Sequence, residues 1–165
     1  MIDDARARFP EAALTAYATS FGGYLFLKYM AEHGNPFEKA AFRCPAVPMY
    51  QVLMDSIVDA GEARLLEKGK DVLVGFDRKI RIGPAFPESL RQADLNAFDF
   101  TAYGDDIIIL HGTKDEMIPI DLVQDFAENN VIEFVPVEGA NHPFQNPNHM
   151  ALAIHQIIEF FHKGD

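Results

Sequence analysis

The sequence contains little that could cross-link, anchor or export the chain. It has a single cysteine, Cys44, so no internal disulfide can form and nothing indicates an oxidising compartment. No stretch approaches the roughly 18–20 apolar residues of a membrane span, and the N-terminus lacks the basic and apolar regions of a secretory signal. We therefore expect a soluble, cytoplasmic protein with no membrane partner.

Basic residues are also scarce. The chain has 14 Lys and Arg against 25 Asp and Glu, a formal net charge of -11. A protein that binds nucleic acid needs clustered Lys and Arg to neutralise phosphates, so we expect no nucleic-acid partner. The remaining composition, with 48% hydrophobic residues, is typical of a globular protein, and 165 residues are enough for one domain.

Short apolar segments alternate with segments of helical length over most of the chain. Strands are predicted over residues 13–18, 39–47, 106–110 and 131–137, and helices over residues 2–11, 24–30, 121–129 and 150–162. Strands that are apolar throughout are typical of a parallel sheet covered by helices on both faces. The sequence therefore predicts an α/β fold with a mostly parallel sheet.

Residues 49–100 interrupt this alternation. Residues 49–68 have helical period, and two short strands follow over 72–76 and 79–82, around a turn at Asp77 and Arg78. Apolar residues recur throughout this stretch. We therefore interpret it as a folded insertion and not as a linker.

One serine lies at a predicted junction of strand and helix. Residues 18–22 read Ala-Thr-Ser-Phe-Gly. A serine hydroxyl attacks only when it is exposed and oriented toward a base, and the nucleophile elbow provides this on a sharp turn between strand and helix. The elbow requires small residues two before and two after the serine, here Ala18 and Gly22. Ser20 is therefore a candidate nucleophile, and a serine at an ordinary turn is the competing interpretation.

Two later loops complete a resemblance to the α/β-hydrolase superfamily, and within it to esterases, monoacylglycerol lipases and serine aminopeptidases. Residues 111–119 have the form His-Gly-x-x-Asp-x-x-x-Pro after a predicted strand, and residues 139–142 have the form Gly-x-x-His after the next one. The resemblance implies that Asp115 is the acid and His142 the base, in the superfamily's order of serine, acid and histidine. It also implies that the backbone N–H of Phe21 donates one hydrogen bond to the oxyanion.

The resemblance further implies how the chain is divided and what it does. Residues 1–48 would form the part of the core with the elbow, residues 49–100 a cap or lid, and residues 101–165 the part with the acid and the histidine. Five apolar residues of the insertion suggest a pocket for an acyl or aromatic group: Met49, Tyr50, Met54, Phe76 and Phe86. The implied activity is hydrolysis of a carboxylic ester, a small-molecule acyl substrate, through an acyl-enzyme, with no cofactor. Peptidase and acyltransferase activity stay open.

Several other residues compete for these roles. Asp115 could instead stabilise the start of the following helix, and Glu116 and Asp121 are alternative acids. His111 precedes a glycine at a strand end and is interpreted as structural. Cys44 is interpreted as an inert buried thiol. The histidines show no metal-ligand spacing with carboxylates or Cys44, so we expect no metal site.

The chain departs from the family at its start. The strands that precede the elbow strand in a complete member are absent, and with them the His-Gly loop that donates the second oxyanion hydrogen bond. The partial hydrolase fold would leave residues 13–18 as an unpaired sheet edge, which invites pairing with another chain. We therefore expect a homo-oligomer. The alternative function is a non-catalytic binding or assembly module.

Overall fold

The computed structural model describes residues 2–58, 63–75 and 79–163, and strands and helices alternate along them. The elements in chain order are α1 (Ile2–Arg8), β1 (Thr15–Thr19), α2 (Phe21–His33), β2 (Lys39–Arg43), α3 (Met49–Val58), α4 (Ala63–Glu67), β3 (Val72–Val74), β4 (Ile80–Ile82), α5 (Ala85–Gln92), β5 (Ile107–Gly112), α6 (Ile120–Asn129), β6 (Glu133–Val137) and α7 (Pro147–Phe161). Two 3-10 helices, Leu95–Ala97 and Thr101–Asp106, precede β5.

Four of the strands form one parallel sheet in the order β1-β2-β5-β6. All six residues of β5 are buried, and the first four are isoleucine and leucine, as expected for a central strand with covered faces. Burying one such aliphatic side chain stabilises a fold by roughly 1.5–3 kcal/mol. The α/β architecture with a parallel sheet is as the sequence predicted.

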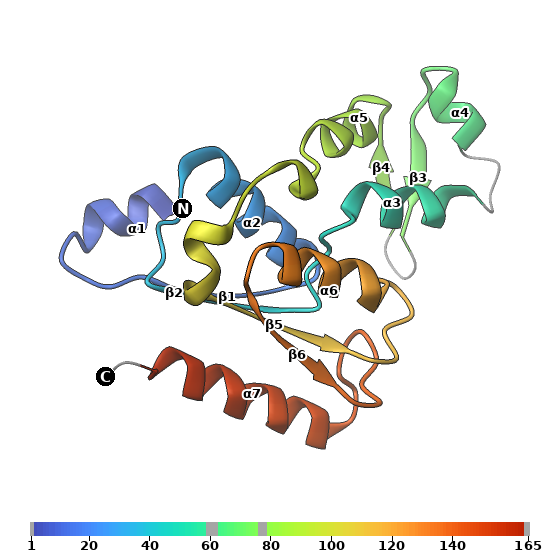
Figure 1. Cartoon of the computed structure of the whole chain (residues 1–165). Coiled ribbons are helices and arrows are strands. Elements are labelled where there is room, and N and C mark those ends of the chain that lie inside the picture. Colours follow the sequence, from blue (N-terminus) through green and yellow to red (C-terminus); the bar gives the residue numbers. More distant parts are fainter. Residues whose placement is uncertain (1, 59–62, 76–78, 164–165) are drawn as a thin grey trace.

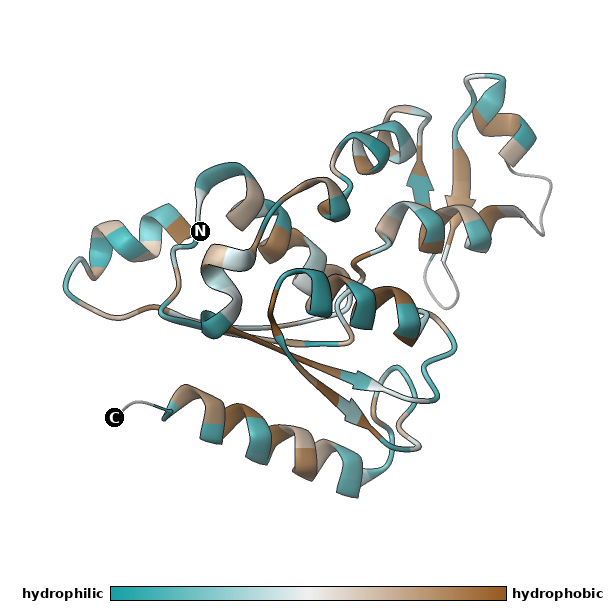
Figure 2. Cartoon of the chain, viewed as in Figure 1, coloured by the Kyte–Doolittle hydropathy of each residue, from teal (hydrophilic) through white to brown (hydrophobic). Residues whose placement is uncertain are grey.

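Helices cover the sheet on both faces, and the pleat of β2 distinguishes them. Ala40 and Phe42 face the side with α2 and α6, whereas Ala41 faces α7, where it packs in one cluster with Ala153 and Ile157. Figure 1 shows α7 on one side of the sheet and α2 and α6 on the other. In Figure 2 β5 and β6 are brown over much of their length, and α7 alternates brown and teal as an amphipathic helix does.

Residues 49–100 lie between β2 and β5 as α3, α4, the antiparallel hairpin of β3 and β4, and α5. Buried residues of this insertion, among them Leu53, Ile57 and Leu90, belong to the same hydrophobic cluster as α2 and the sheet. The segment therefore packs as folded structure, as predicted. The helix expected over 49–68 is described as two helices, and residues 59–62 and the predicted turn at Asp77 and Arg78 lie outside the described residues.

Two predicted strand boundaries are wrong, for local reasons. β2 ends at Arg43 because Cys44 has a φ of 44°, which takes the backbone out of the extended region before Pro45. β6 begins at Glu133 because Val131 has a φ of 57°. In both cases the sequence continues to look like a strand, but the backbone turns.

The strand predicted over 13–18 lies at 15–19, and only one of its faces is buried. Ala16 and Ala18 are buried, whereas the Tyr17 side chain is 48% exposed. The expected covering of both sheet faces by helices is therefore incomplete at β1, which lies at the edge of the sheet, whereas α7 contacts β2 and β5. Among the described residues β1 pairs with β2 alone. No helix of the described part has the length and apolarity to cross a membrane.

Candidate active site

Ser20 lies on a strained turn between β1 and α2. Its φ of 51° and ψ of −124° are unusual for a residue with a side chain, and such strain persists only where neighbouring contacts hold it. The Ser20 N–H donates to the Arg43 carbonyl at 3.1 Å, and the Ser20 carbonyl accepts from the Ala46 N–H at 3.0 Å. The last residue of β2 and the loop that follows it therefore hold the turn through its N–H and its carbonyl.

The glycines after Ser20 differ in how much space surrounds them. A Cβ at Gly22 would lie 3.7 Å from the Ala18 Cβ, an ordinary contact. A Cβ at Gly23 would lie 2.8 Å from the Pro45 Cβ and 3.1 Å from its Cα, which is too close. Ala18 and Gly22 do face each other as the motif predicts, but the glycine that the packing requires is Gly23.

Asp115 follows β5 and has a side chain that is fully buried. Its Oδ1 accepts the N–H groups of Met117 and Ile118, both at 2.9 Å, and its Oδ2 lies 2.7 Å from His142 Nδ1. Burial raises the pKa of this carboxyl, but the hydrogen bonds from His142, Ile118 and Met117 outweigh burial and lower the pKa to about 2. Asp115 is therefore ionised at neutral pH.

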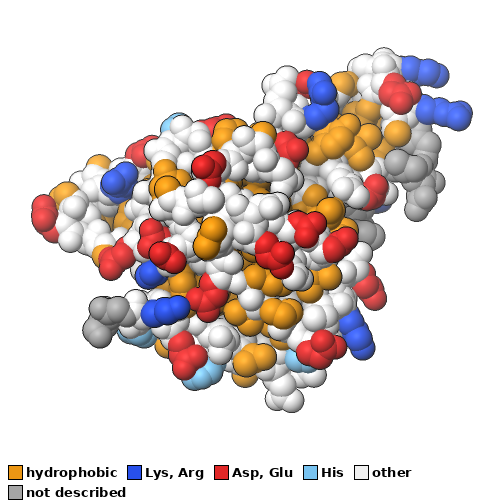
Figure 3. All heavy atoms as spheres, viewed as in Figure 1, with side chains coloured by type: hydrophobic (Ala, Val, Ile, Leu, Met, Phe, Trp, Pro, Cys, Tyr) orange, Lys and Arg blue, Asp and Glu red, His pale blue; other side chains and the backbone are white. Residues whose placement is uncertain are grey.

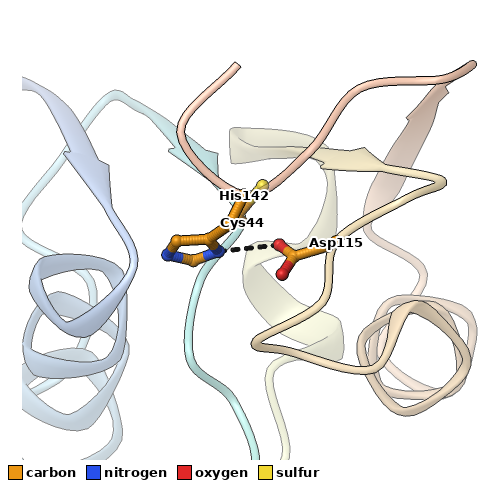
Figure 4. A group of neighbouring side chains, drawn as sticks. All are labelled: Cys44, Asp115 and His142. Carbon is orange, nitrogen blue, oxygen red and sulfur yellow. Dashed lines mark hydrogen bonds and ion pairs between the residues drawn. The ribbon is translucent and has the colours of Figure 1, made fainter. Parts of the chain in front are cut away.

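His142 lies after β6 and joins the other two residues. Its Nδ1 faces Asp115, as Figure 4 shows, and its Nε2 lies 3.0 Å from Ser20 Oγ, across 122 residues of chain. A carboxylate only accepts hydrogen bonds, so Nδ1 donates to Asp115 and Nε2 is left to accept the serine hydroxyl. The three residues singled out in the sequence therefore touch in series. Glu116 and Asp121, the alternative acids, are exposed.

The loops that carry Asp115 and His142 are bonded to each other. The Lys114 N–H donates to the Ala140 carbonyl at 2.9 Å, and the Gly139 N–H donates to Thr113 Oγ1 at 2.8 Å. A Cβ at Gly112 would overlap the Ala140 carbonyl, so only glycine allows this approach. The distance between acid and base is thus set by backbone contacts as well as by their own hydrogen bond.

His111 is a second histidine beside the acid. It is completely buried, and its Nε2 lies 3.1 Å from the Ile118 carbonyl and 3.3 Å from Asp115 Oδ2. Both partners are acceptors, so Nε2 carries the hydrogen. Burial lowers the pKa of His111, which keeps the ring neutral. The sequence interpretation of His111 as structural agrees with this burial, but its contact with Asp115 was not foreseen.

Cys44 lies beside Asp115 and His142. Its sulfur, an Asp115 oxygen and a His142 ring nitrogen lie within 4.8 Å of one another, close enough to share a metal ion (Figure 4). Burial raises the pKa of the Cys44 thiol to about 12, so the sulfur stays protonated, and Asp115 and His142 already bond to each other. These contacts fit an inert thiol. That the protein binds no metal ion stays a prediction.

Phe21 begins α2, where backbone N–H groups have no carbonyl four residues before them to bond. Its N–H is therefore available beside Ser20, and its side chain, 37% exposed, stacks on Tyr24.

An apolar cavity of about 490 Å³ opens next to Phe21. It is lined by Phe21, Met49, Leu53, Val74, Ile80, Arg81, Ile82, Gly83 and Phe86. Met49 and Phe86 were expected in this pocket. Tyr50 instead lines a smaller cavity of about 200 Å³ with Tyr24, Met54 packs against the main hydrophobic cluster, and Phe76 lies outside the described residues.

No family model and no curated protein matches the chain. Solved structures do. Alpha/beta hydrolase domain-containing protein 10 from mouse superposes with a TM-score of 0.67 at 17% identity, over 99% of this chain and 69% of that one. The esterase domain of a Rhodothermus marinus protein gives a TM-score of 0.59 at 17% identity, over 96% of this chain and 65% of that domain.

A monoacylglycerol lipase from Paleococcus ferrophilus gives a TM-score of 0.60 at 15% identity, over 95% of this chain and 73% of that one. Across eight of the matched structures this chain spans between 54% and 73% of their length. At such low identity the likeness establishes how the chain folds. The chain therefore has the fold of the α/β hydrolases, over nearly its entire length and over about two thirds of theirs.

Proposed function

We propose that this chain is a serine hydrolase that cleaves a carboxylic ester through an acyl-enzyme, with Ser20 as nucleophile. The observation that carries the proposal is the series Ser20 Oγ, His142 and Asp115, joined by contacts of 3.0 and 2.7 Å. The matched esterases and lipase support ester cleavage as the general class of reaction. Three residues far apart in the chain rarely meet in this order and geometry without a chemical role.

In the proposed reaction His142 Nε2 takes the proton of Ser20 as Oγ attacks the ester carbonyl. The oxyanion that forms accepts a hydrogen bond from the Phe21 N–H, and one such donor lowers a barrier by about 3 kcal/mol. His142 then protonates the departing alcohol. A water molecule, deprotonated by His142, then attacks the acyl carbonyl. As the bond to Ser20 Oγ breaks and the acid leaves, His142 returns the proton to Oγ and restores the serine. Asp115 stays ionised, holds the tautomer of the ring and stabilises the imidazolium in both steps.

The substrate is proposed to carry an apolar acyl group. The cavity beside Phe21 is lined almost entirely by apolar residues, with Arg81 as the one charged side chain among those that line it. Its volume of about 490 Å³ lies within the range of ordinary small-molecule sites. No step of this reaction requires a cofactor. Peptide and acyl-transfer reactions use the same three residues, so a substrate panel must decide among them.

A non-catalytic role in assembly is the second candidate, and one observation favours it. β1 lies at the edge of the sheet, and among the described residues its outer edge has no partner strand. Such an edge pairs readily with another chain. We propose that a second copy of this chain pairs there, which predicts a homo-oligomer. Light scattering after size exclusion tests this, and a stable monomer of 18.5 kDa would rule it out.

A fluorophosphonate probe tests the catalytic proposal directly. Wild-type protein should be labelled on Ser20, and Ser20→Ala should abolish labelling while the melting temperature stays close to wild type. Ser56→Ala is the matched control, because the Ser56 hydroxyl donates to the Leu53 carbonyl within α3 and is no part of the proposed site. Labelling that survives Ser20→Ala would reject the nucleophile, and a correctly folded wild type that is never labelled would favour the assembly role.

A further inference from the structure

One residue outside the three proposed catalytic groups contacts the segments of both the nucleophile and the base. Arg43 is the last residue of β2, between the elbow strand β1 and the central strand β5. Its backbone carbonyl accepts the Ser20 N–H at 3.1 Å. Its guanidinium Nη1 donates to the His142 backbone carbonyl at 2.8 Å. A single residue therefore joins the turn of Ser20 to the loop of His142.

Two further contacts fix the guanidinium in this position. It lies 5.0 Å from the centre of the Phe144 ring, in the geometry of a cation on an aromatic face. Its Nε donates to the Tyr17 hydroxyl at 3.3 Å, from the neighbouring strand. Phe144 has a φ of 54°, so the loop after His142 is held in a backbone conformation that a phenylalanine rarely adopts. The cation on its ring, together with the bond to His142, opposes relaxation of that loop.

We propose that Arg43 is a positioning residue for the reaction, acting through His142 and without touching the substrate. The imidazole must hold its Nε2 toward Ser20 while Nδ1 faces Asp115, and a carbonyl anchored by a charged donor restricts movement of the whole residue. Small misplacements of catalytic groups lower rates steeply, on the order of 100-fold for 1 Å. This inference rests on the function proposed above and adds a residue to it.

β2 offers a matched control at its other end. Lys39 lies on the same face of the strand, donates to the Asp105 carbonyl at 2.9 Å, and lies 5.0 Å from the centre of the Phe160 ring. It therefore resembles Arg43 in charge, carbonyl contact and aromatic partner, but it is remote from Ser20. Arg43→Met and Lys39→Met remove similar packing and charge, and only the first removes the contact with the His142 loop.

The experiment measures ester hydrolysis and the nitrogen NMR spectrum of His142 in both variants. Arg43→Met should lower kcat about 10- to 100-fold with little change in KM, and should alter the His142 Nδ1 signal that reports its bond to Asp115. Lys39→Met should change neither. Arg43→Lys, which keeps a charge but loses the planar fork, should restore part of the rate. The His142 signal is assigned with His142→Gln.

The outcomes separate this inference from the proposed function. A wild type without hydrolase activity refutes the function, and the His142 signal in Arg43→Met still decides whether Arg43 orients the ring. Full activity with an unchanged His142 signal in Arg43→Met overturns the inference and leaves the function standing. Equal losses in Arg43→Met and Lys39→Met also overturn it, because the effect would then be general stability. If Arg43→Met does not fold, Arg43→Lys and Tyr17→Phe carry the same readouts, and an unchanged signal in both overturns it.

Discussion

The carboxyl end of the sheet and the insertion over 49–100 are held together by different forces. At the sheet end, polar groups from distant parts of the chain meet at distances of 2.7 to 3.1 Å, as between Asp115, His142, Ser20 and Arg43. In the insertion, contacts are mainly apolar, and the hairpin leaves Leu73 and Ile80 at least half exposed. In Figure 3 hydrophobic side chains gather at the upper right, where the hairpin lies.

This difference indicates how each region tolerates change. Hydrogen bonds depend steeply on distance and angle, so the sheet end allows one arrangement of its groups. Apolar contacts have no direction, so the insertion can repack around a changed side chain at modest cost. We therefore expect substitutions at the sheet end to change rate or folding, and substitutions in the insertion to change substrate preference.

Loss of the Asp115 carboxylate should give the largest change, a fall in kcat. Asp115→Asn keeps the shape of the side chain, but it removes the negative charge that fixes the tautomer of His142. By comparison with other triads kcat should fall about 10⁴-fold. Steady-state hydrolysis of an activated ester measures this. Glu116→Gln, an exposed neighbour, is the control and should stay near wild type; a reversed outcome would transfer the acid role to Glu116.

The two glycines after Ser20 should differ in stability. Gly23→Ala forces a Cβ against Pro45, and overpacking of this kind costs about 1–3 kcal/mol in the free energy of unfolding. Gly22→Ala meets only an ordinary contact and should be neutral, or stabilising by up to about 1 kcal/mol through helix propensity. Urea denaturation of both variants decides this. Equal changes in the free energy of unfolding would show that the backbone around Gly23 shifts to make room for the added Cβ.

Acid should weaken the fold partly through Asp115. Its pKa is about 2 in the folded protein, below its ordinary value of 3.8, so the ionised carboxylate stabilises the fold above pH 4. That contribution, about 2 kcal/mol, is lost as the pH falls from about 4 toward 2. The difference in unfolding free energy between wild type and Asp115→Asn should therefore shrink over this range. A constant difference down to pH 2 would contradict the lowered pKa.

The sheet and the three candidate residues could be predicted because each is encoded by neighbouring residues, the sheet by apolar runs and the candidates by short motifs. The first four residues of β5, 107–110, are all aliphatic, and Ser20, Asp115 and His142 each follow a predicted strand. Parallel strands bring such residues to one edge of the sheet. The contact of His111 with Asp115, the position of Arg43 and the tight space at Gly23 were not predicted. Each depends on a distance between segments far apart in the chain. The one feature of the sequence that could have pointed to the role of Arg43 is a cation at the carboxyl end of a buried strand.

Substrate preference should respond to the insertion, with the smallest effect of the set. Phe86 lines the cavity beside Phe21, whereas Leu73 on the hairpin is 50% exposed and does not line it. Phe86→Ala removes apolar surface that an acyl chain would contact, and it should lower kcat/KM for a butyrate ester relative to an acetate ester by about 10-fold. Leu73→Ala should leave the ratio unchanged. Because the ratio cancels losses common to both esters, a shift confined to Phe86→Ala reports the pocket itself, whereas the same shift in both variants would place the acyl group elsewhere.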